Sequence, residues 1–139
     1  MPHSRIGVVV SAMGGMTNKL LKLSGLAEQA DNSYEAELNE IGQRYADTAK
    51  ELVAGDALVG LLDQWNVEAG DIRNILKAIA SVKSAPQRSR DVVAGYGEIW
   101  STRLLAAHLG QQSAQRGGTW IDARKVITVA ETELGPTVL

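Results

Sequence analysis

The stretch Val8-Val9-Val10-Ser11-Ala12-Met13-Gly14-Gly15-Met16-Thr17-Asn18 changes character twice over a short distance. Ile6–Val10 is a continuous, largely β-branched apolar run, which is typical of a strand covered on both faces. Gly14-Gly15 interrupts the run, and Thr17 or Asn18 is suited to cap a following helix. The order of strand, small-residue turn and helix predicts an α/β fold with Ile6–Val10 as a central strand.

Size, charge and cysteine content limit the possible functions. The 139 residues amount to one domain, long enough to bury roughly 68–70% of the surface of its unfolded chain. The net charge of −2, from 14 basic and 16 acidic residues, predicts neither nucleic acid nor an anionic membrane as a partner. No cysteine is present, which excludes disulfides and thiolate catalysis and suits a reducing compartment. No apolar window approaches the ~18 residues of a membrane helix.

The remaining chain predicts four more helices. One follows Ser33, and a short one is closed by the polar stretch Asn66–Gly70. Another opens at Asp71 and stops at Ser84-Ala85-Pro86, and the last runs to about Leu109. The apolar stripe of the helix after Ser33 consists of Tyr34, Leu38, Ile41, Tyr45, Ala49 and Leu52.

The predicted strands are too few for a stable sheet. Apart from Ile6–Val10, only Thr119–Asp122 and the mixed stretch Val126–Val129 have a strand-like pattern. Backbone groups of a buried strand need neighbouring strands as partners. We therefore expect an open sheet edge or a missing piece, and self-association of the chain through that edge.

The turn after the first predicted strand is suited to bind an anion. Ligands of open α/β folds bind where a strand leads into a helix, because backbone amides and the positive helix end are exposed there. Ser11 and Thr17 would add hydroxyl donors, and Gly14-Gly15 would let a ligand approach the backbone. The spacing is not that of a Walker loop. The alternative is a tight strand-to-helix connection that binds nothing.

A second glycine-bearing motif lies at Gly95-Tyr96-Gly97-Glu98-Ile99-Trp100-Ser101. Two glycines inside a helix cost ~1 kcal/mol each relative to alanine, so they suggest close packing against another backbone. We expect Glu98 to be partly enclosed by its aromatic and apolar neighbours. An enclosed carboxylate requires a cation, such as a substrate ammonium group or a nearby Arg or Lys. The alternative is a solvent-facing or salt-bridged glutamate.

Three ordered segments, VVVSAMGGMTNKL, DVVAGYGEIWSTRLLAAHL and TWIDARKVI, resemble the aspartate kinases of the amino-acid kinase family. The likeness spans nearly the whole chain, although length and pattern alone support it over residues 30–84. It implies a partial amino-acid-kinase-like α/β/α fold, predominantly helical with a few short, mainly parallel strands. The parent enzyme is either monofunctional or fused to homoserine dehydrogenase.

The resemblance also implies a substrate and the residues that bind it. Ser11 matches the serine that lines the family's catalytic pocket, Thr17 matches a threonine that contacts substrate L-aspartate, and Glu98 matches a glutamate that contacts bound aspartate. Trp120, Asp122 and Arg124 match a family segment that we interpret as structural support. No catalytic residue and no metal ligand is assigned, and neither His3 nor His108 has a second ligand at a suitable spacing.

The chain departs from the family in what flanks these segments. Aspartate kinases begin with a K-F-G-G-T-S strand and loop that helps neutralise phosphate charge, and they continue into a nucleotide-binding portion. Residues 1–139 are thus predicted to be an internal fragment, an incomplete amino-acid kinase domain. The complete parent would use ATP and Mg²⁺, whereas no cofactor is expected on the fragment, which should be inactive alone.

Two further readings remain open. The chain is alternatively a non-catalytic helical binding or assembly protein derived from the fold, or, less favoured, a relative that acts on another acid such as acetylglutamate. The predicted location is the cytoplasm, or the plastid if the parent comes from a photosynthetic eukaryote.

Overall fold

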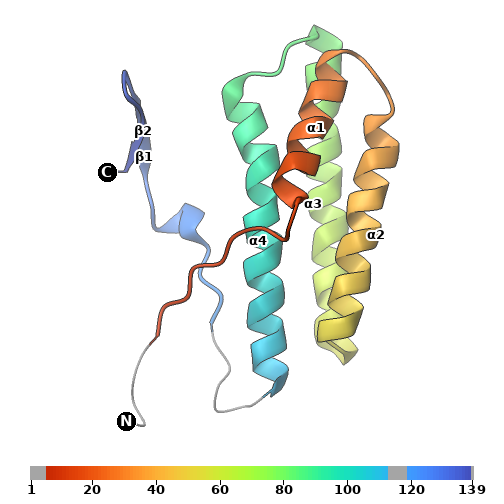
Figure 1. Ribbon diagram of the computed structural model, residues 1–139, viewed down its shortest axis with the longest axis vertical. Coiled ribbons are helices and arrows are strands. Elements are labelled where there is room, and N and C mark those ends of the chain that lie inside the picture. The colour runs from red at the N-terminus through yellow and green to blue at the C-terminus, as the bar shows by residue number, and fades with distance from the viewer. Residues whose placement is uncertain (1–5, 113–118, 139) are drawn as a thin grey trace.

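The computed structural model describes residues 6–112 and 119–138. Helices account for most of these residues, and the strands form one hairpin near the carboxyl end (Figure 1). The elements are α1 (Met16–Glu28), α2 (Tyr34–Leu52), α3 (Gly55–Val82), α4 (Gln87–Gln112), the 3₁₀ turn η1 (Ala123–Lys125), β1 (Val129–Thr132) and β2 (Gly135–Val138).

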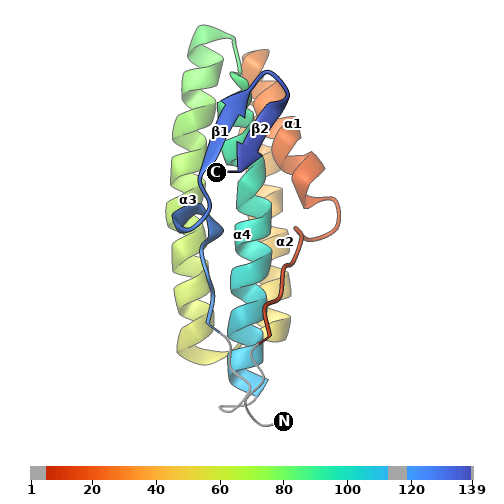
Figure 2. The ribbon, with the colours of Figure 1, turned by 90° about the vertical axis from the view of Figure 1, so that its left-hand side faces the viewer.

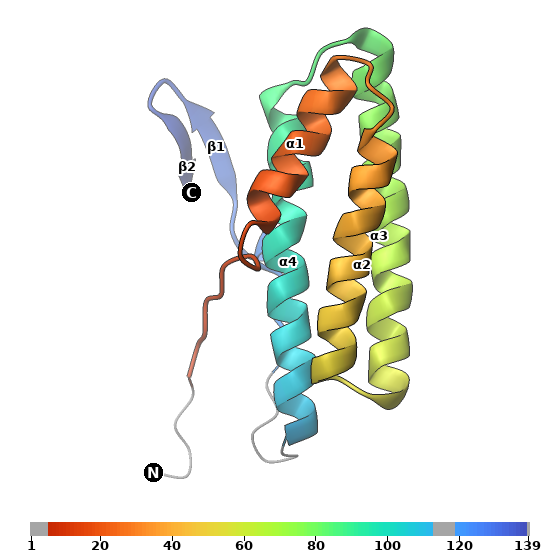
Figure 3. The ribbon, with the colours of Figure 1, turned by 45° about the vertical axis from the view of Figure 1, so that its right-hand side comes forward.

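The four helices form an up-and-down bundle, in which the shorter α1 packs against the other three (Figure 3). Short connections make successive helices antiparallel neighbours. The stripe predicted for the helix after Ser33 is confirmed over most of its length, because its first five members are buried and only Leu52 is exposed. The buried members are Tyr34, Leu38, Ile41, Tyr45 and Ala49.

Aromatic rings fill the centre of the bundle. Trp65 of α3 and Trp100 of α4 lie 5.7 Å apart between ring centroids, and Tyr45 of α2 lies 6.0 Å from Trp100. Gly42 lets the Trp65 ring rest on the backbone of α2, since a Cβ at this position would overlap the ring. Trp65 and Trp100 are thus core residues, and they lie between α2, α3 and α4.

The prediction of two helices between residues 55 and 82 is wrong, because α3 runs through Asn66–Gly70 without a break. Gly70 costs the helix ~1 kcal/mol. Ala69 is 0% exposed, and its burial helps to offset that cost, while Glu68, 5% exposed, is paired with Arg103 inside the bundle. The polar residues of this stretch therefore do not mark a loop, because one of them, Glu68, faces the core within a continuous helix.

The strand prediction for Ile6–Val10 is also wrong. The segment is extended but unpaired, with Ile6 83% and Val9 100% exposed. A strand forms only beside a chain that accepts its backbone hydrogen bonds, and no described segment pairs with this one. Thr119–Asp122 is not a strand either, for the same reason, and leads into η1.

In the described residues, the sheet is the antiparallel hairpin β1–β2, with Val129 opposite Val138 and Thr132 opposite Gly135. The predicted mainly parallel strands are therefore wrong for the described residues, whereas the predominance of helix is confirmed. Thr132 holds the turn, because its hydroxyl donates to the Gly135 carbonyl at 2.7 Å. Gly135 takes a φ of 102°, which glycine adopts without strain. The amino-acid-kinase fold stays a prediction.

α4 carries apolar residues outside its core-facing side as well as on it. Trp100 and Leu104 face the core, while Val92 and Leu109 face outward and are 45% and 38% exposed. Within residues 6–112 and 119–138, none of the helices has the length and apolar character that crossing a bilayer requires.

Candidate functional site

The turn before α1 is in contact with the middle of α4. A Cβ added at the buried Gly97 would lie 3.0 Å from the Cβ of Ala12, and 3.4 and 3.5 Å from side-chain atoms of Leu20 and Met16. Glycine permits this approach without displacing Ala12, whereas a Cβ at this position would require Ala12 to shift. The predicted close packing is confirmed at Gly97, whereas Gly95 faces open space. The segments that carry Ser11 and Glu98 therefore touch through their sequence neighbours.

Glycine, not a hydroxyl residue, shapes the start of α1. Gly15 precedes the helix with a φ of 75°, and no side chain caps the helix, so the capping role predicted for Thr17 or Asn18 is wrong. Thr17 is half-buried in the first turn, and Ser11 is exposed in the extended segment before it. The first backbone amides of a helix have no acceptor within the helix. Two hydroxyls and these amides thus lie along one short piece of chain.

Glu98 is exposed, so the predicted partial enclosure of its carboxylate is wrong. Trp100 faces the core, and a separation of two residues in an α-helix turns Glu98 to nearly the opposite side. Of the alternatives that the sequence left open, the described residues show the solvent-facing carboxylate. We call this side of α4, with Glu98 and Thr102 four residues apart, the outer face of α4.

The outer face of α4 lies between two extended segments, one from each end of the described chain (Figure 2). On one side, Ala12, at the end of the extended segment 6–12, approaches Gly97. On the other side, the Trp120 indole Nε1 donates to the Thr102 hydroxyl at 2.9 Å. The Thr102 hydroxyl in turn lies 2.9 Å from the Glu98 carbonyl oxygen, to which it donates.

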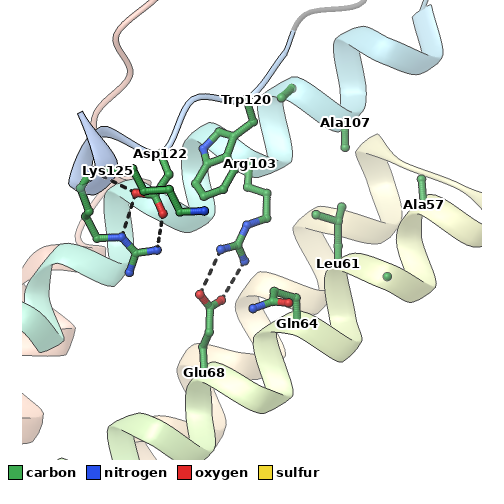
Figure 4. Close-up of a pocket in the computed structure, with 12 residues that line it drawn as sticks. Ala57, Leu61, Gln64, Glu68, Arg103, Ala107, Trp120, Asp122 and Lys125 are labelled. Atoms are coloured by element: carbon green, nitrogen blue, oxygen red, sulfur yellow. Dashed lines mark hydrogen bonds and ion pairs between the residues drawn. The ribbon is translucent and has the colours of Figure 1, made fainter. Parts of the chain in front are cut away.

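A shallow cavity of about 710 Å³ lies on the far side of Trp120, between α3, α4 and residues 120–125. Its floor is an ion pair that joins α3 to α4 (Figure 4). Arg103 Nη1 and Nη2 donate to the Glu68 carboxylate at 2.8 and 3.0 Å. The Trp100 indole donates to the same carboxylate at 3.2 Å. Both charged side chains are largely buried, with 14% and 6% exposure for Arg103 and Glu68.

Neither Glu68 nor Arg103 is among the site residues that the sequence motifs predict. Glu68 follows Trp65 by three residues and precedes Ile72 by four, so it continues the buried stripe of α3. This helical spacing indicates that Glu68 is buried. It is recognisable only if Asn66–Gly70 is helical, whereas the sequence pattern predicts a connection between two helices there.

Residues 120–125 hold their own shape. The Asp122 carboxylate accepts hydrogen bonds from the Arg124 backbone N and Nε at 3.0 and 2.9 Å, and from Nη2 at 2.7 Å. These contacts with Arg124 lower the pKa of Asp122 to about 2. Trp120 is half-buried under the Arg103 guanidinium, 4.9 Å from ring centroid to Cζ, and does not join the central core.

The end of α4 is fixed by polar contacts to the connection between α2 and α3. His108 Nδ1 lies 2.7 Å from the Leu52 carbonyl, and the Gln111 amide bonds both backbone groups of Ala54. His108 therefore has a structural role, because its ring nitrogen binds the backbone at the end of α2. In the described part of the chain, no group of three or more acidic, cysteine or histidine side chains is suited to a metal. His3 lies outside the described residues.

Comparison with known proteins identifies relatives over most of the chain, although no family model matches it. The bifunctional aspartokinase/homoserine dehydrogenase 1, chloroplastic, of Zea mays is 35% identical over 131 residues, which cover 92% of this chain and 14% of that protein. Its Arabidopsis thaliana counterpart is 35% identical over 125 residues, 90% of this chain and 14% of the relative. Aspartokinase 2, chloroplastic, of Arabidopsis thaliana is 34% identical over 114 residues, 79% and 20% of the two chains. The chain is related to the aspartokinases.

The relationship to the aspartokinases extends the resemblance found in the three motifs. A match that covers 92% of the chain must include most of residues 30–84, which no motif supported. Both monofunctional and bifunctional aspartokinases are among the relatives. The chain spans about 14% of the length of the bifunctional relatives and 20% of the monofunctional one, so it corresponds to a limited part of either.

Proposed function

We propose that this chain forms part of the L-aspartate site of an aspartate kinase. The observation that carries the proposal is the contact of Gly97 with Ala12, because it joins the segment with Ser11 and Thr17 to the helix with Glu98. The kinship with aspartokinases supplies the substrate class. The activity proposed for the whole enzyme is phosphorylation of L-aspartate to 4-phospho-L-aspartate, early in the synthesis of lysine, threonine and methionine.

The three side chains suit the two ends of an amino-acid substrate. Hydroxyls of Ser11 and Thr17, with the backbone amides of Thr17 and Asn18 in the first turn of α1, would donate to carboxylate oxygens. Glu98 would accept from the α-ammonium group. An exposed ion pair contributes only ~0.2–1 kcal/mol, so recognition by these residues alone should be weak. Strong binding would require that further protein cover the outer face of α4 and exclude water.

ATP and Mg²⁺ are assigned to other parts of the enzyme. The described residues offer no cluster of acidic side chains for the metal, and the Gly14-Gly15 turn lacks the spacing of a Walker loop. Phosphoryl transfer depends on charge neutralisation around the γ-phosphate, for which the bound nucleotide and its metal supply the chemistry. We therefore propose that these 139 residues do not phosphorylate aspartate by themselves.

Calorimetry with L-aspartate and succinate tests the assignment, because succinate has both carboxylates and no ammonium group. The wild-type chain should bind L-aspartate more tightly than succinate. Glu98→Gln should remove this preference and leave succinate binding unchanged, whereas Ser11→Ala or Thr17→Val should weaken both ligands. Glu51→Gln, at another exposed glutamate on α2, is the matched control. Equal affinity of the wild type for the two ligands would refute the role of Glu98.

A second proposal is self-association, which the exposed apolar segments favour. Val9 is 100% and Val8 65% exposed in the unpaired segment before α1, and Leu134 is fully exposed at the hairpin turn. Extended apolar chain with free backbone groups is a template for pairing. Sedimentation of the wild type should show mass increasing with concentration, and Val8→Lys/Val9→Lys should shift it toward the monomer. A monomeric wild type at all concentrations would exclude this proposal.

The location proposed for the function is the plastid. The relatives that match this chain are named as chloroplastic proteins, which supports the plastid over the cytoplasm among the two predicted locations.

A further inference from the structure

Glu68 is the buried end of a chain of contacts that reaches the backbone carbonyl of Glu98. Its carboxylate accepts from Arg103 through two nitrogens and from the Trp100 indole, and the residue is 5% exposed. Two parallel bonds to a planar guanidinium fix both its position and its orientation. The Arg103 side chain is therefore held in one place on the surface of α4, with its flat face available to a neighbour.

Trp120 occupies that face. The Arg103 Cζ lies 4.9 Å from the ring centroid, a distance at which a cation and an indole attract. The same indole donates its Nε1 hydrogen to Thr102 at 2.9 Å. Trp120 is thus held by two successive residues of α4. Arg103 contacts the face of its ring, and Thr102 accepts the hydrogen bond from Nε1 at the edge.

Thr102 passes the contact on to the backbone at Glu98. Its hydroxyl accepts from Trp120 and donates within α4, where the Glu98 carbonyl lies at 2.9 Å and the Ile99 carbonyl at 3.1 Å. A hydroxyl that accepts one bond and donates another is polarised. We call Glu68, Arg103, Trp120 and Thr102 the α4 clamp.

We propose that the α4 clamp positions Glu98 for recognition of the substrate ammonium group, an inference that rests on the proposed function. The clamp fixes the turn of α4 that carries Glu98 on the side opposite to the Gly97 contact. It also holds residues 119–122 along the edge of the outer face of α4. The members of the clamp are positioning residues, because none of them needs to touch the substrate.

Two conservative substitutions separate the clamp from general packing. Trp120→Phe keeps an aromatic face for Arg103 and removes the N–H donor, whereas Thr102→Val keeps the shape and removes the hydroxyl. Thr48→Val is the matched control, because the Thr48 hydroxyl also donates to a carbonyl four residues earlier, that of Arg44 at 2.9 Å, but on α2. All three variants are compared for affinity toward L-aspartate and succinate, and for the urea midpoint of unfolding.

We expect Trp120→Phe and Thr102→Val each to lower the preference for L-aspartate over succinate by about 3- to 10-fold, the effect of one lost hydrogen bond. The double variant should lose no more than the larger single effect, because both changes break one chain of contacts. Thr48→Val should shift the urea midpoint but keep the preference. An unchanged preference in both clamp variants, or additive losses in the double variant, would overturn the inference.

Hydrogen exchange distinguishes failure of the clamp from failure of the proposed function. If the wild type does not prefer L-aspartate, the proposed function fails, and the clamp is judged by exchange at the backbone amides of residues 119–125. Faster exchange there in Thr102→Val, by about 3-fold or more over Thr48→Val, supports the clamp. Equal exchange in the two variants refutes it.

Discussion

Replacing Gly97 by alanine tests the contact that joins the two motifs. The new methyl group would lie 3.0 Å from the Cβ of Ala12, closer than such carbons normally approach. Ala12 has no rotamer that would relieve the overlap, so its backbone must move. Leu20 and Met16, at 3.4 and 3.5 Å, make nearly ordinary contacts and can adjust. The strain therefore falls on the extended segment before α1, which carries Ser11.

The expected size follows from two opposing terms. Alanine improves helix propensity by ~1 kcal/mol over glycine, and overpacking in a close contact costs ~1–3 kcal/mol. Gly97→Ala should thus destabilise the chain by about 0–2 kcal/mol. Gly95→Ala is the matched control two residues away, because a Cβ there meets nothing within 4 Å and should stabilise by up to ~1 kcal/mol.

Urea unfolding followed by circular dichroism measures the difference between the two variants. We expect Gly95→Ala to be more stable than Gly97→Ala by ~1–3 kcal/mol, with the same dependence on urea. Gly97→Ala should also weaken binding of L-aspartate, because the Ser11 segment is displaced. Equal stability of the two alanine variants would refute the close approach of Ala12 to α4.

Three further changes test the interior of the bundle. Gly42→Ala should destabilise the chain by ~2 kcal/mol or more in urea unfolding, because the new methyl group overlaps the rigid Trp65 ring; wild-type stability would contradict this packing. Glu68→Ala should cost ~3–5 kcal/mol by leaving Arg103 unpaired, whereas Glu68→Leu/Arg103→Met should cost less; a double variant as unstable as the single one would argue against a buried pair. Burial raises the pKa of Tyr45 from 10.0 to about 12, because the folded state disfavours the charged phenolate. The contribution of neutral Tyr45 to the free energy of unfolding is therefore fully present below pH 10 and is lost as the pH rises through 12. In alkaline unfolding, Tyr45→Phe should lose less stability over this interval than the wild type, and identical curves would exclude the effect.

The helical part of the fold could be predicted because helices carry their own periodicity. The stripe from Tyr34 to Ala49 repeats every three or four residues, and tertiary packing follows it directly. The break at Asn66–Gly70 was wrong because residue type alone does not show that Glu68 is paired inside the protein. The strand at Ile6–Val10 failed for another reason: its composition indicates a segment that favours a sheet, but not whether a partner strand lies beside it.

The sequence predicts the close packing of α4 at Gly97, but it does not predict that the Glu98 side chain is exposed. Two glycines in α4 indicated close packing, and the structure shows it at Gly97. The exposure of Glu98 follows from the angle between it and Trp100, a consequence of helix geometry that the identity of its neighbours obscured. Arg103 lies within α4 and Trp120 lies after it, before η1. Their contact depends on how the chain returns along α4, which no local sequence pattern predicts.

The short links between the helices have a consequence for the order of events during synthesis. Residues 29–33, 53–54 and 83–86 connect helices that pack on their sequence neighbours, so closing each pair requires little loop entropy. Helical bundles fold within microseconds to milliseconds, far faster than a ribosome adds ~5–20 residues each second. The bundle should therefore assemble as soon as α4 has left the ribosome, because α1 packs against α4 as well as against α2 and α3. Residues 119–138 would then pack against a bundle that has already folded.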